Sequence, residues 1–175
     1  KDLKNSKVLI IGGGAIGLLC ALILEKYKKC QKIILVEPNE KRLKVCSNYL
    51  DSDTLKPDNK RIMDNSFDLV FDTVGLEITR QNSIKAVNPG GVIVHIGLTQ
   101  PSGTFNFRKA TLQEIIFVGT YCYTNRDFEK TLSLLSNNSL GKLEWIEYRE
   151  LNKGAEAFKE IHDGTCSAPK IILIP

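Results

Sequence analysis

The chain is poor in the residues that build metal sites and disulfide frameworks. It has two histidines, His95 and His162, far apart in the sequence, and its five cysteines include no C-x-x-C pair. Zinc sites draw on closely spaced Cys and His residues, so we assign no metal-ligating residue. An odd number of widely spaced cysteines argues against a disulfide framework and indicates a reducing, cytoplasmic compartment. We interpret these residues as packing or surface residues and assign no catalytic residue.

Long apolar runs and blocks of one charge are also missing. The longest apolar stretch, Ala15–Leu24, falls short of the roughly 18 residues that span a membrane. The 24 Lys and Arg residues are scattered among 20 Asp and Glu residues, for a net charge of +4. Neither a membrane nor a nucleic acid is therefore an expected partner. At 175 residues the chain is about one domain, and because it begins at Lys1 without a methionine or signal peptide, we expect a fragment of a longer protein.

The most informative feature that is present is a glycine motif directly after an apolar strand. The strand Lys7–Ile11 runs into G-x-G-x-x-G at Gly12, Gly14 and Gly17, and an apolar helix follows over Ala15–Lys28. The first glycine allows a sharp turn, the second lets backbone approach a pyrophosphate, and the third allows close helix packing. The free N–H groups of the first helical turn would then face the phosphates. The buried face of this helix is predicted to carry Ile16, Leu19, Cys20, Ile23, Leu24 and Tyr27.

An acidic residue stands where a dinucleotide-binding unit needs one. A second apolar strand, Lys32–Val36, is followed by Glu37, twenty residues past Gly17. This order of strand, glycines, helix, strand and acid is typical of a dinucleotide-binding βαβ unit. Glu37 would accept hydrogen bonds from the adenosine ribose, and its charge would repel a 2′-phosphate, so NAD is favoured over NADP. The alternative is a glycine turn in a doubly wound sheet that binds no ligand.

Strands and helices alternate along the rest of the chain. This alternation predicts an α/β fold, namely a doubly wound, mostly parallel six-stranded sheet with helices on both faces and a C-terminal helix and strand tail. The predicted strands are Phe67–Asp72, Val92–Ile96, Ile115–Val118, Ile146–Tyr148 and Lys170–Ile174, with short strands possible at 54–55 or 61–63 and at the edge segment Thr104–Phe107. The predicted helices are Pro38–Tyr49, Glu77–Val87, Arg108–Glu114, 125–137 and Lys153–His162.

Several sequence segments together resemble one family. They are similar to the coenzyme-binding (Rossmann) domain of medium-chain, zinc-type alcohol dehydrogenases, and they cover nearly the whole chain. The segments are Val8–Gly17, Leu35–Arg42, Phe67–Gly75, Val87–Gly97, Ile116–Tyr121 and Pro169–Pro175. One departure is that the segment between the second helix and Phe67 is shorter than in the family, so a helix covering the adenine side is expected to be missing.

The resemblance implies a set of NAD-binding residues. The glycine loop would hold the pyrophosphate, Glu37 with Arg42 nearby would hold the ribose, and Pro38 and Val74 would sandwich the adenine. Backbone around Ile96–Leu98 and at Thr120 would hold the nicotinamide carboxamide. Lys170 would lie near the pyrophosphate. The expected cofactor-binding residues are Gly12, Gly14, Ala15, Ile16, Gly17, Glu37, Pro38, Arg42, Thr73, Val74, Gly75, Ile96, Gly97, Leu98 and Thr120.

The resemblance also implies what lies outside the chain. In such enzymes a catalytic domain with its zinc precedes the coenzyme domain, so residues 1–122 would bind the dinucleotide and residues 123–175 would pack with that domain. The fragment would position nicotinamide for hydride transfer to or from an alcohol, aldehyde or polyol, and would be inactive alone. Coenzyme domains of the family pair around a two-fold axis, so a homo-oligomer is expected through Thr104–Phe107 and Ile115–Val118, an apolar sheet edge.

Four other interpretations stay open from the sequence. A zinc-free quinone or enoyl reductase of the same superfamily would carry the same segments. An FAD-binding domain shares the glycines and the acid, although the further glycine–aspartate motif of such domains is not convincingly present. A methyltransferase that uses S-adenosylmethionine fits the Phe67–Gly75 segment poorly. A module that senses NAD without catalysis is the alternative outside the enzymes.

Overall fold

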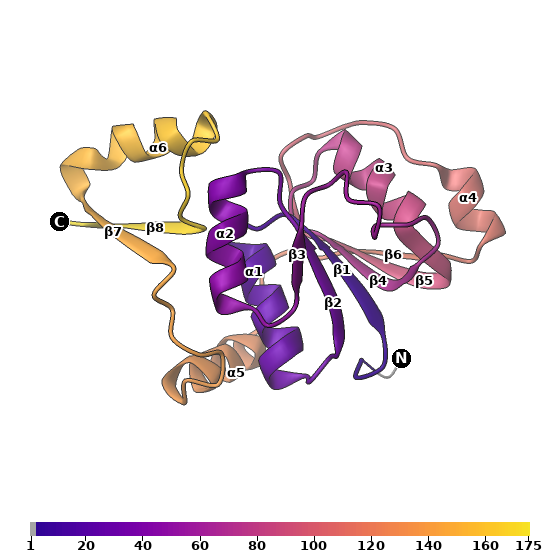
Figure 1. Ribbon diagram of the computed structural model, residues 1–175, viewed down its shortest axis with the longest axis horizontal. Coiled ribbons are helices and arrows are strands. Elements are labelled where there is room, and N and C mark those ends of the chain that lie inside the picture. Colours follow the sequence, from indigo (N-terminus) through magenta and orange to yellow (C-terminus); the bar gives the residue numbers. More distant parts are fainter. Residues whose placement is uncertain (1–2) are drawn as a thin grey trace.

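A parallel β-sheet forms the centre of the structure (Figure 1). The computed structural model describes residues 3–175, so Lys1, where the expected dinucleotide domain begins, lies outside the described residues. Six strands pair in the order β3-β2-β1-β4-β5-β6, all parallel. They are β1 (Lys7–Ile11), β2 (Lys32–Val36), β3 (Asp53–Leu55), β4 (Phe67–Asp72), β5 (Val87–His95) and β6 (Ile116–Gly119). This is the strand order of the Rossmann fold, so the predicted fold class is confirmed.

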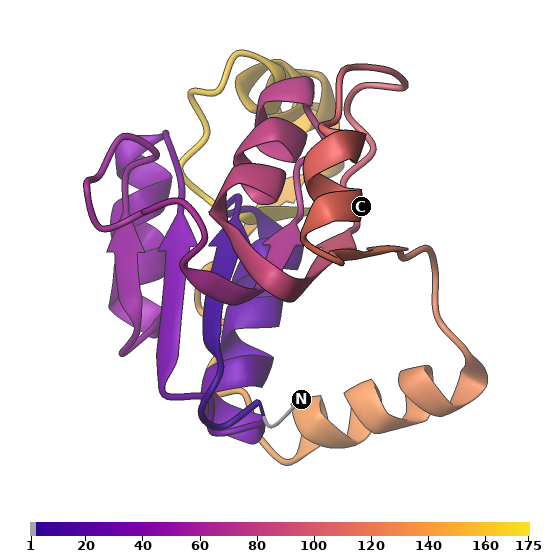
Figure 2. The ribbon, with the colours of Figure 1, turned by 90° about the vertical axis from the view of Figure 1, so that its right-hand side faces the viewer.

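Helices cover both faces of this sheet (Figures 1 and 2). One face packs against α1 (Ala15–Leu22), its π-helical continuation (Ile23–Tyr27) and α2 (Glu40–Tyr49). The other face packs against α3 (Glu77–Ala86) and α4 (Phe107–Leu112). Crossover helices on alternate faces are what a parallel sheet requires, because each returning chain must pass over one face.

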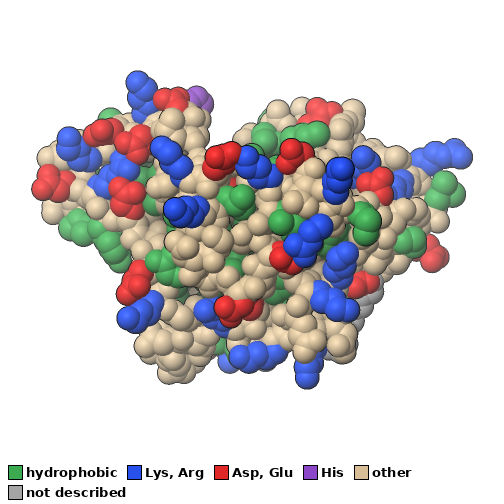
Figure 3. All heavy atoms as spheres, in the orientation of Figure 1, with side chains coloured by type: hydrophobic (Ala, Val, Ile, Leu, Met, Phe, Trp, Pro, Cys, Tyr) green, Lys and Arg blue, Asp and Glu red, His purple; other side chains and the backbone are tan. Residues whose placement is uncertain are grey.

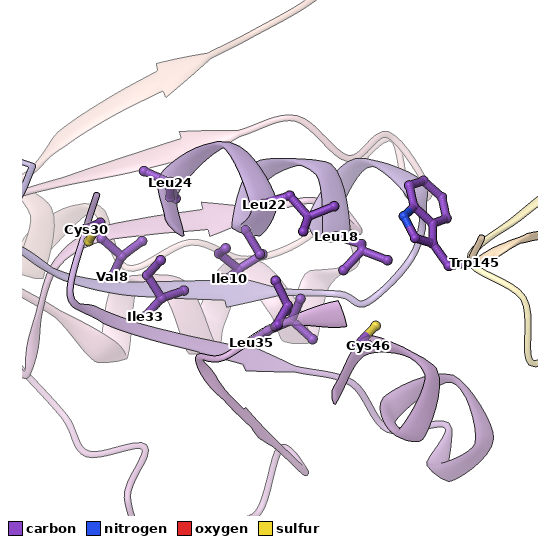
Figure 4. Close-up of a cluster of buried hydrophobic side chains, with 12 residues drawn as sticks. Val8, Ile10, Leu18, Leu22, Leu24, Cys30, Ile33, Leu35, Cys46 and Trp145 are labelled. Atoms are coloured by element: carbon purple, nitrogen blue, oxygen red, sulfur yellow. The ribbon is translucent and has the colours of Figure 1, made fainter. Parts of the chain in front are cut away.

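The inner strands are buried on both faces. Val8 and Ile10 contact the cluster under α1 and α2, which Figure 4 shows, whereas Leu9 and Ile11 belong to the cluster under α3. Because successive side chains of a strand point to opposite faces, a strand covered on both sides reads as one continuous apolar run. The sequence signal at Lys7–Ile11 therefore had a direct structural cause.

The predicted buried face of α1 is confirmed at Leu24 and wrong at Ile16 and Tyr27. The buried residues are Gly17, Leu18, Ala21 and Leu22, with Leu24 just beyond the helix, whereas Ile16 is 49% exposed and Tyr27 is 38% exposed. The helix sequence is apolar almost all round, so its period could not select a face. The turn that precedes the helix sets its rotation, because Gly17 packs directly against the backbone of Gly12.

Two further boundaries differ from expectation. Thr104–Phe107 is not a strand, because the segment is irregular until Asn106 caps α4 by accepting a hydrogen bond from the Lys109 N–H at 2.9 Å. β5 begins at Val87 rather than Val92, with an irregular register where Phe67 and Leu69 pair with it. The remaining predicted elements of the main sheet lie within a few residues of their observed bounds.

The C-terminal part forms a second, smaller layer. Its elements are α5 (Asn125–Ser136), β7 (Ile146–Glu150), a 3-10 turn (Leu151–Lys153), α6 (Gly154–His162) and β8 (Lys170–Ile174). β7 and β8 pair in parallel as a separate two-stranded sheet, beyond α1 and α2 in Figure 1. Figure 2 shows α5 joined to β6 by an extended segment and lying away from α3 and α4. Trp145 ties this part to the core, because it is 5% exposed and belongs to the cluster under α1.

The surface carries mixed charges and several exposed apolar side chains. On the face seen in Figure 3, Lys and Arg side chains alternate with Asp and Glu, without a block of one sign. Within residues 3–175 no helix combines the length and the apolar character that crossing a bilayer demands. On the edge strand β6, the side chains of Ile116, Phe117 and Val118 are 54%, 44% and 41% exposed.

Candidate dinucleotide-binding site

The strand ends that carry the predicted site residues meet along one edge of the sheet. Ile11 pairs with Val36 on one side and with Asp72 on the other, and Asp72 pairs in turn with His95. Gly12, Glu37, Thr73 and Ile96 each follow one of these residues directly. Successive strands are added on one side of β1 as far as β3 and on its other side from β4 onward. Ligands of doubly wound sheets bind at this switch point in the strand order, between β1 and β4. In Figure 3 the surface is hollowed between α6 and α3, close to these strand ends.

The three motif glycines differ in the space available for a side chain. A Cβ at Gly17 would lie 1.8 Å from the Gly12 carbonyl oxygen, so only glycine allows α1 to pack this closely. Gly12 has a φ of +105°, and a Cβ there would lie 2.6 Å from Val74. A Cβ at Gly14 would meet no heavy atom within 4 Å, so its backbone faces open space. This arrangement fits a loop that a pyrophosphate approaches at Gly14.

The start of α1 offers unpaired backbone donors toward that open space. Gly14 is the N-cap, and no side chain caps the helix. The first turn holds no acidic residue, and the first helical hydrogen bond runs from the Leu18 N–H to the Gly14 carbonyl at 2.9 Å. The N–H groups of Ala15, Ile16 and Gly17 therefore have no partner within the helix, and with the positive end of the helix dipole they favour an anion.

Glu37 is buried, and each of its two carboxylate oxygens accepts a hydrogen bond from a backbone N–H group. One carboxylate oxygen accepts from the Gly13 N–H at 2.8 Å, and the other accepts from the Asn39 N–H at 2.9 Å. The Arg42 guanidinium lies 3.7 Å from the second oxygen, and Glu37 is 4% exposed. A carboxylate has about four acceptor positions, so lone pairs remain for ribose hydroxyls. The structure thus adds a loop-holding contact to the ribose role predicted from the sequence.

Cys46 lies under the glycine loop, a position that the sequence reasoning missed. Its thiol donates to the Gly13 carbonyl at 3.4 Å. Burial, reinforced by the charge of Glu37, raises the pKa of this thiol to about 12, so it stays protonated and remains a donor. The Gly13 peptide is therefore held by Glu37 at its N–H and by Cys46 at its carbonyl. The available signal was helical spacing, because Cys46 stands one turn after Arg42 on α2.

The C-terminal segment reaches the same corner of the site. The Asn39 side-chain amide donates to the Gly164 carbonyl at 2.5 Å, and Arg42 donates to the Cys166 carbonyl at 3.0 Å. These contacts span more than 120 residues, so no local sequence pattern indicates them. Lys170, expected near the pyrophosphate, is exposed at the start of β8.

The expected nicotinamide side is built from backbone. The N–H groups of Ile96 and Gly97 donate to the Asp72 carbonyl at 2.9 and 3.0 Å, and the Thr120 N–H donates to the His95 carbonyl at 2.9 Å. Pro38 and Thr120 are exposed, and Thr73 and Val74 are half-buried at the turn after β4. Among residues 3–175, no three His, Cys, Asp or Glu side chains gather in a way that could hold a metal ion.

Comparisons with known proteins place this geometry among dehydrogenases. A family model described as zinc-binding dehydrogenase matches residues 15–137. A probable D-xylulose reductase A of Neosartorya fischeri is 26% identical over an alignment of 173 positions that covers 91% of this chain and 48% of that protein. The (R,R)-butanediol dehydrogenase of Saccharomyces cerevisiae is 27% identical over an alignment of 192 positions that covers 98% of this chain and 49% of that protein.

A solved structure shares the fold. The acetophenone reductase of Geotrichum candidum, determined in complex with NAD, superposes with a TM-score of 0.84 at 21% identity, over 94% of this chain and 47% of that one. The chain spans about half the length of the curated relatives it matches.

Proposed function

This chain belongs to the zinc-binding dehydrogenase family, and we propose that it is the NAD(H)-binding portion of an alcohol or polyol dehydrogenase. The observation that carries the proposal is the glycine loop, which opens at Gly14 onto free space in front of unpaired helix N–H groups. The substrate class rests on the relatives, which are named as a xylulose reductase and a butanediol dehydrogenase. Residues 1–122 would bind the cofactor, and residues 123–175 would pack with a catalytic domain outside this chain.

The contribution of this chain is to bind and orient the cofactor. When bound, the dinucleotide would supply hydride-transfer chemistry between its nicotinamide ring and a substrate carbon. The helix N-terminus and the Gly12–Gly17 loop would hold the pyrophosphate, Val74 would lie against the adenine, and the Ile96–Leu98 backbone would hold the nicotinamide half. The described residues do not fit a zinc site, so we derive no step through zinc and assign no catalytic residue here.

The buried charge of Glu37 supports NAD over NADP. A 2′-phosphate at the ribose would be placed beside a carboxylate that is 4% exposed, where repulsion is weakly screened. All five cysteines are free in the structure, which supports a reducing, cytoplasmic compartment. The edge strand β6 supports a homo-oligomer, because its exposed apolar side chains would be covered if the edge paired with another chain.

Replacing Gly14 with alanine tests the proposal. The Gly14 backbone is at φ −70° and ψ −175°, which alanine adopts freely, and the added methyl meets nothing in the protein. We expect an unchanged melting temperature and at least a tenfold loss of NADH affinity, since the methyl takes the space of the pyrophosphate. Calorimetric titration of the intact protein with NADH, and with FAD in parallel, measures the affinities, and thermal unfolding followed by circular dichroism measures the melting temperature.

The proposal fails if the folded wild-type protein does not bind NADH, or if it binds FAD in preference. It is weakened in its structural detail if Gly14→Ala binds NADH as tightly as the wild type does.

A further inference from the structure

The loop after β5 rests directly on the turn after β4. A Cβ at Gly75 would lie 2.0 Å from the Gly97 carbonyl oxygen, so no side chain separates the two segments. The Thr99 N–H donates to the Val74 carbonyl at 3.3 Å, and the Gln100 N–H donates to the Gly75 carbonyl at 3.0 Å. A shift of one segment therefore moves the other.

Arg80 lies one turn into α3 and donates hydrogen bonds to both the turn after β4 and the loop after β5. Its Nη1 donates to the Gly75 carbonyl at 2.9 Å and to the Gln100 carbonyl at 3.3 Å, and its Nη2 donates to the Ser102 carbonyl. The loop can approach this closely because a Cβ at Gly103 would lie 2.6 Å from Nη2. A guanidinium suits this role, because its planar fork offers several donors in a fixed geometry.

Two neighbouring carboxylates accept further backbone hydrogen bonds, one at the turn after β4 and one at the far end of the loop. Asp72 accepts from the Val74 and Gly75 N–H groups at 3.1 and 2.9 Å, which sets the turn from inside the sheet. Glu77 accepts from the Thr104 N–H at 3.1 Å, which holds the far end of the loop on α3. The Asp72 carboxylate also pairs with His95 at the end of β5, at 3.1 Å, whereas Arg80 donates to the turn after β4 and to the loop after β5.

The backbone position of Leu98 depends on these hydrogen bonds. Leu98 follows Gly97 in the segment expected to meet the nicotinamide, and its side chain is 73% exposed. Side-chain packing therefore contributes little to its position. The hydrogen bonds of its neighbours and the guanidinium of Arg80 determine where its backbone lies.

We propose that Arg80 is a positioning residue for the nicotinamide half of the bound dinucleotide. The inference rests on the proposed function and adds to it a side chain outside the glycine loop. Arg80 acts through the carbonyls of Gly75, Gln100 and Ser102, which keep the Ile96–Leu98 backbone in register with the turn after β4. The adenosine and pyrophosphate half has separate supports, because Glu37 holds the glycine loop and Asp72 holds the Val74 N–H.

Comparing two ligands tests this inference. NADH engages both halves of the site, whereas ADP-ribose lacks nicotinamide and engages only the half at the glycine loop. In the intact protein we expect Arg80→Met to raise the Kd for NADH roughly tenfold and to leave the Kd for ADP-ribose within about twofold. Arg80→Lys, which keeps a charge but reaches fewer carbonyls, should recover part of the NADH affinity. The emission of bound NADH, which reports the surroundings of nicotinamide, should shift toward that of free NADH in Arg80→Met.

Arg61→Met is the matched control, because Arg61 is an exposed arginine paired with Asp53 beside β3. It should change neither Kd. The inference is overturned if Arg80→Met weakens both ligands equally, or weakens neither. If Arg80→Met does not fold, the same comparison on Arg80→Lys decides. A wild-type protein that binds neither ligand would instead overturn the proposed function.

Discussion

At the scale of single residues, Glu37 carries two separable tasks. Its charge faces the expected ribose, and its oxygens hold the N–H groups of Gly13 and Asn39. Glu37→Gln removes the charge and keeps an oxygen for the glycine loop, whereas Glu37→Ser removes both. We expect Glu37→Gln to bring the Kd values for NADH and NADPH closer together with a small change for NADH. Glu37→Ser should in addition weaken NADH roughly tenfold, because a buried charge-assisted hydrogen bond is lost. Fluorescence titration with both cofactors measures these effects.

Glu40 supplies the control for these variants. It is an exposed acid at the start of α2, and its partner is Lys56 on the surface. Glu40→Gln should leave the ratio of the two Kd values unchanged. An unchanged ratio in Glu37→Gln would contradict the assignment of Glu37 to cofactor choice.

Most of the predicted site residues follow strand ends, whereas Arg42, implied by the family resemblance, lies inside α2. Parallel strands bring all their carboxyl ends to one edge, so a pattern of strands is enough to place Gly12, Glu37, Thr73 and Ile96 together. Cys46 and Arg80 have no such marker. Each lies inside a helix, and its contact with backbone depends on how that helix packs.

At the scale of elements, β6 is an edge strand of the main sheet. It pairs with β5 on one side, and its apolar side chains are exposed. Val118→Lys places a charge on this edge, and a buried charge in a paired interface is costly. We expect the wild-type protein to have a dimer mass by light scattering and Val118→Lys to shift toward the monomer. Ile78→Lys, at another exposed apolar position, on α3, is the control that should stay dimeric.

A wild-type monomer at micromolar concentration would contradict the edge-pairing prediction. So would a dimer that Val118→Lys leaves intact. The segment Thr104–Phe107 could still take part in such an interface without being a strand, since the rings of Phe105 and Phe117 lie 5.2 Å apart.

At the scale of the whole molecule, the C-terminal part is coupled to the central sheet. Trp145, the single tryptophan of the chain, is buried beside α1, as Figure 4 shows. Trp145→Ala should lower the free energy of unfolding by about 3–5 kcal/mol, because a large side chain leaves a cavity. Trp145→Phe should cost much less, since the indole N–H is buried without a hydrogen-bond partner among the described residues. Urea unfolding followed by circular dichroism measures both variants.

Equal losses in the two variants would contradict this account of Trp145, because they would assign the effect to the indole N–H. No loss in Trp145→Ala would mean that the C-terminal part contributes little to the core. Arg42 and Asn39 add a second connection, from α2 to the carbonyls of Cys166 and Gly164.

The order of elements along the chain was readable without a structure. Continuous apolar runs predict buried strands, glycines with positive φ or close contacts mark the turns, and alternation with helices predicts a parallel sheet. These signals are local, so the succession of strands and helices along the chain and the edge that carries the site followed from them. The glycine motif with Glu37 pointed to a dinucleotide for the same reason.

Packing between distant segments was decided only in three dimensions. The rotation of α1 depends on the contact between Gly17 and Gly12, and a uniformly apolar helix does not encode it. Three side chains donate hydrogen bonds to backbone carbonyls in other elements. Cys46 donates to Gly13, Arg80 to Gly75, and Arg42 to Cys166. Such contacts arise from the tertiary arrangement, because backbone carbonyls are chemically alike along the chain and only folding selects which one a side chain meets.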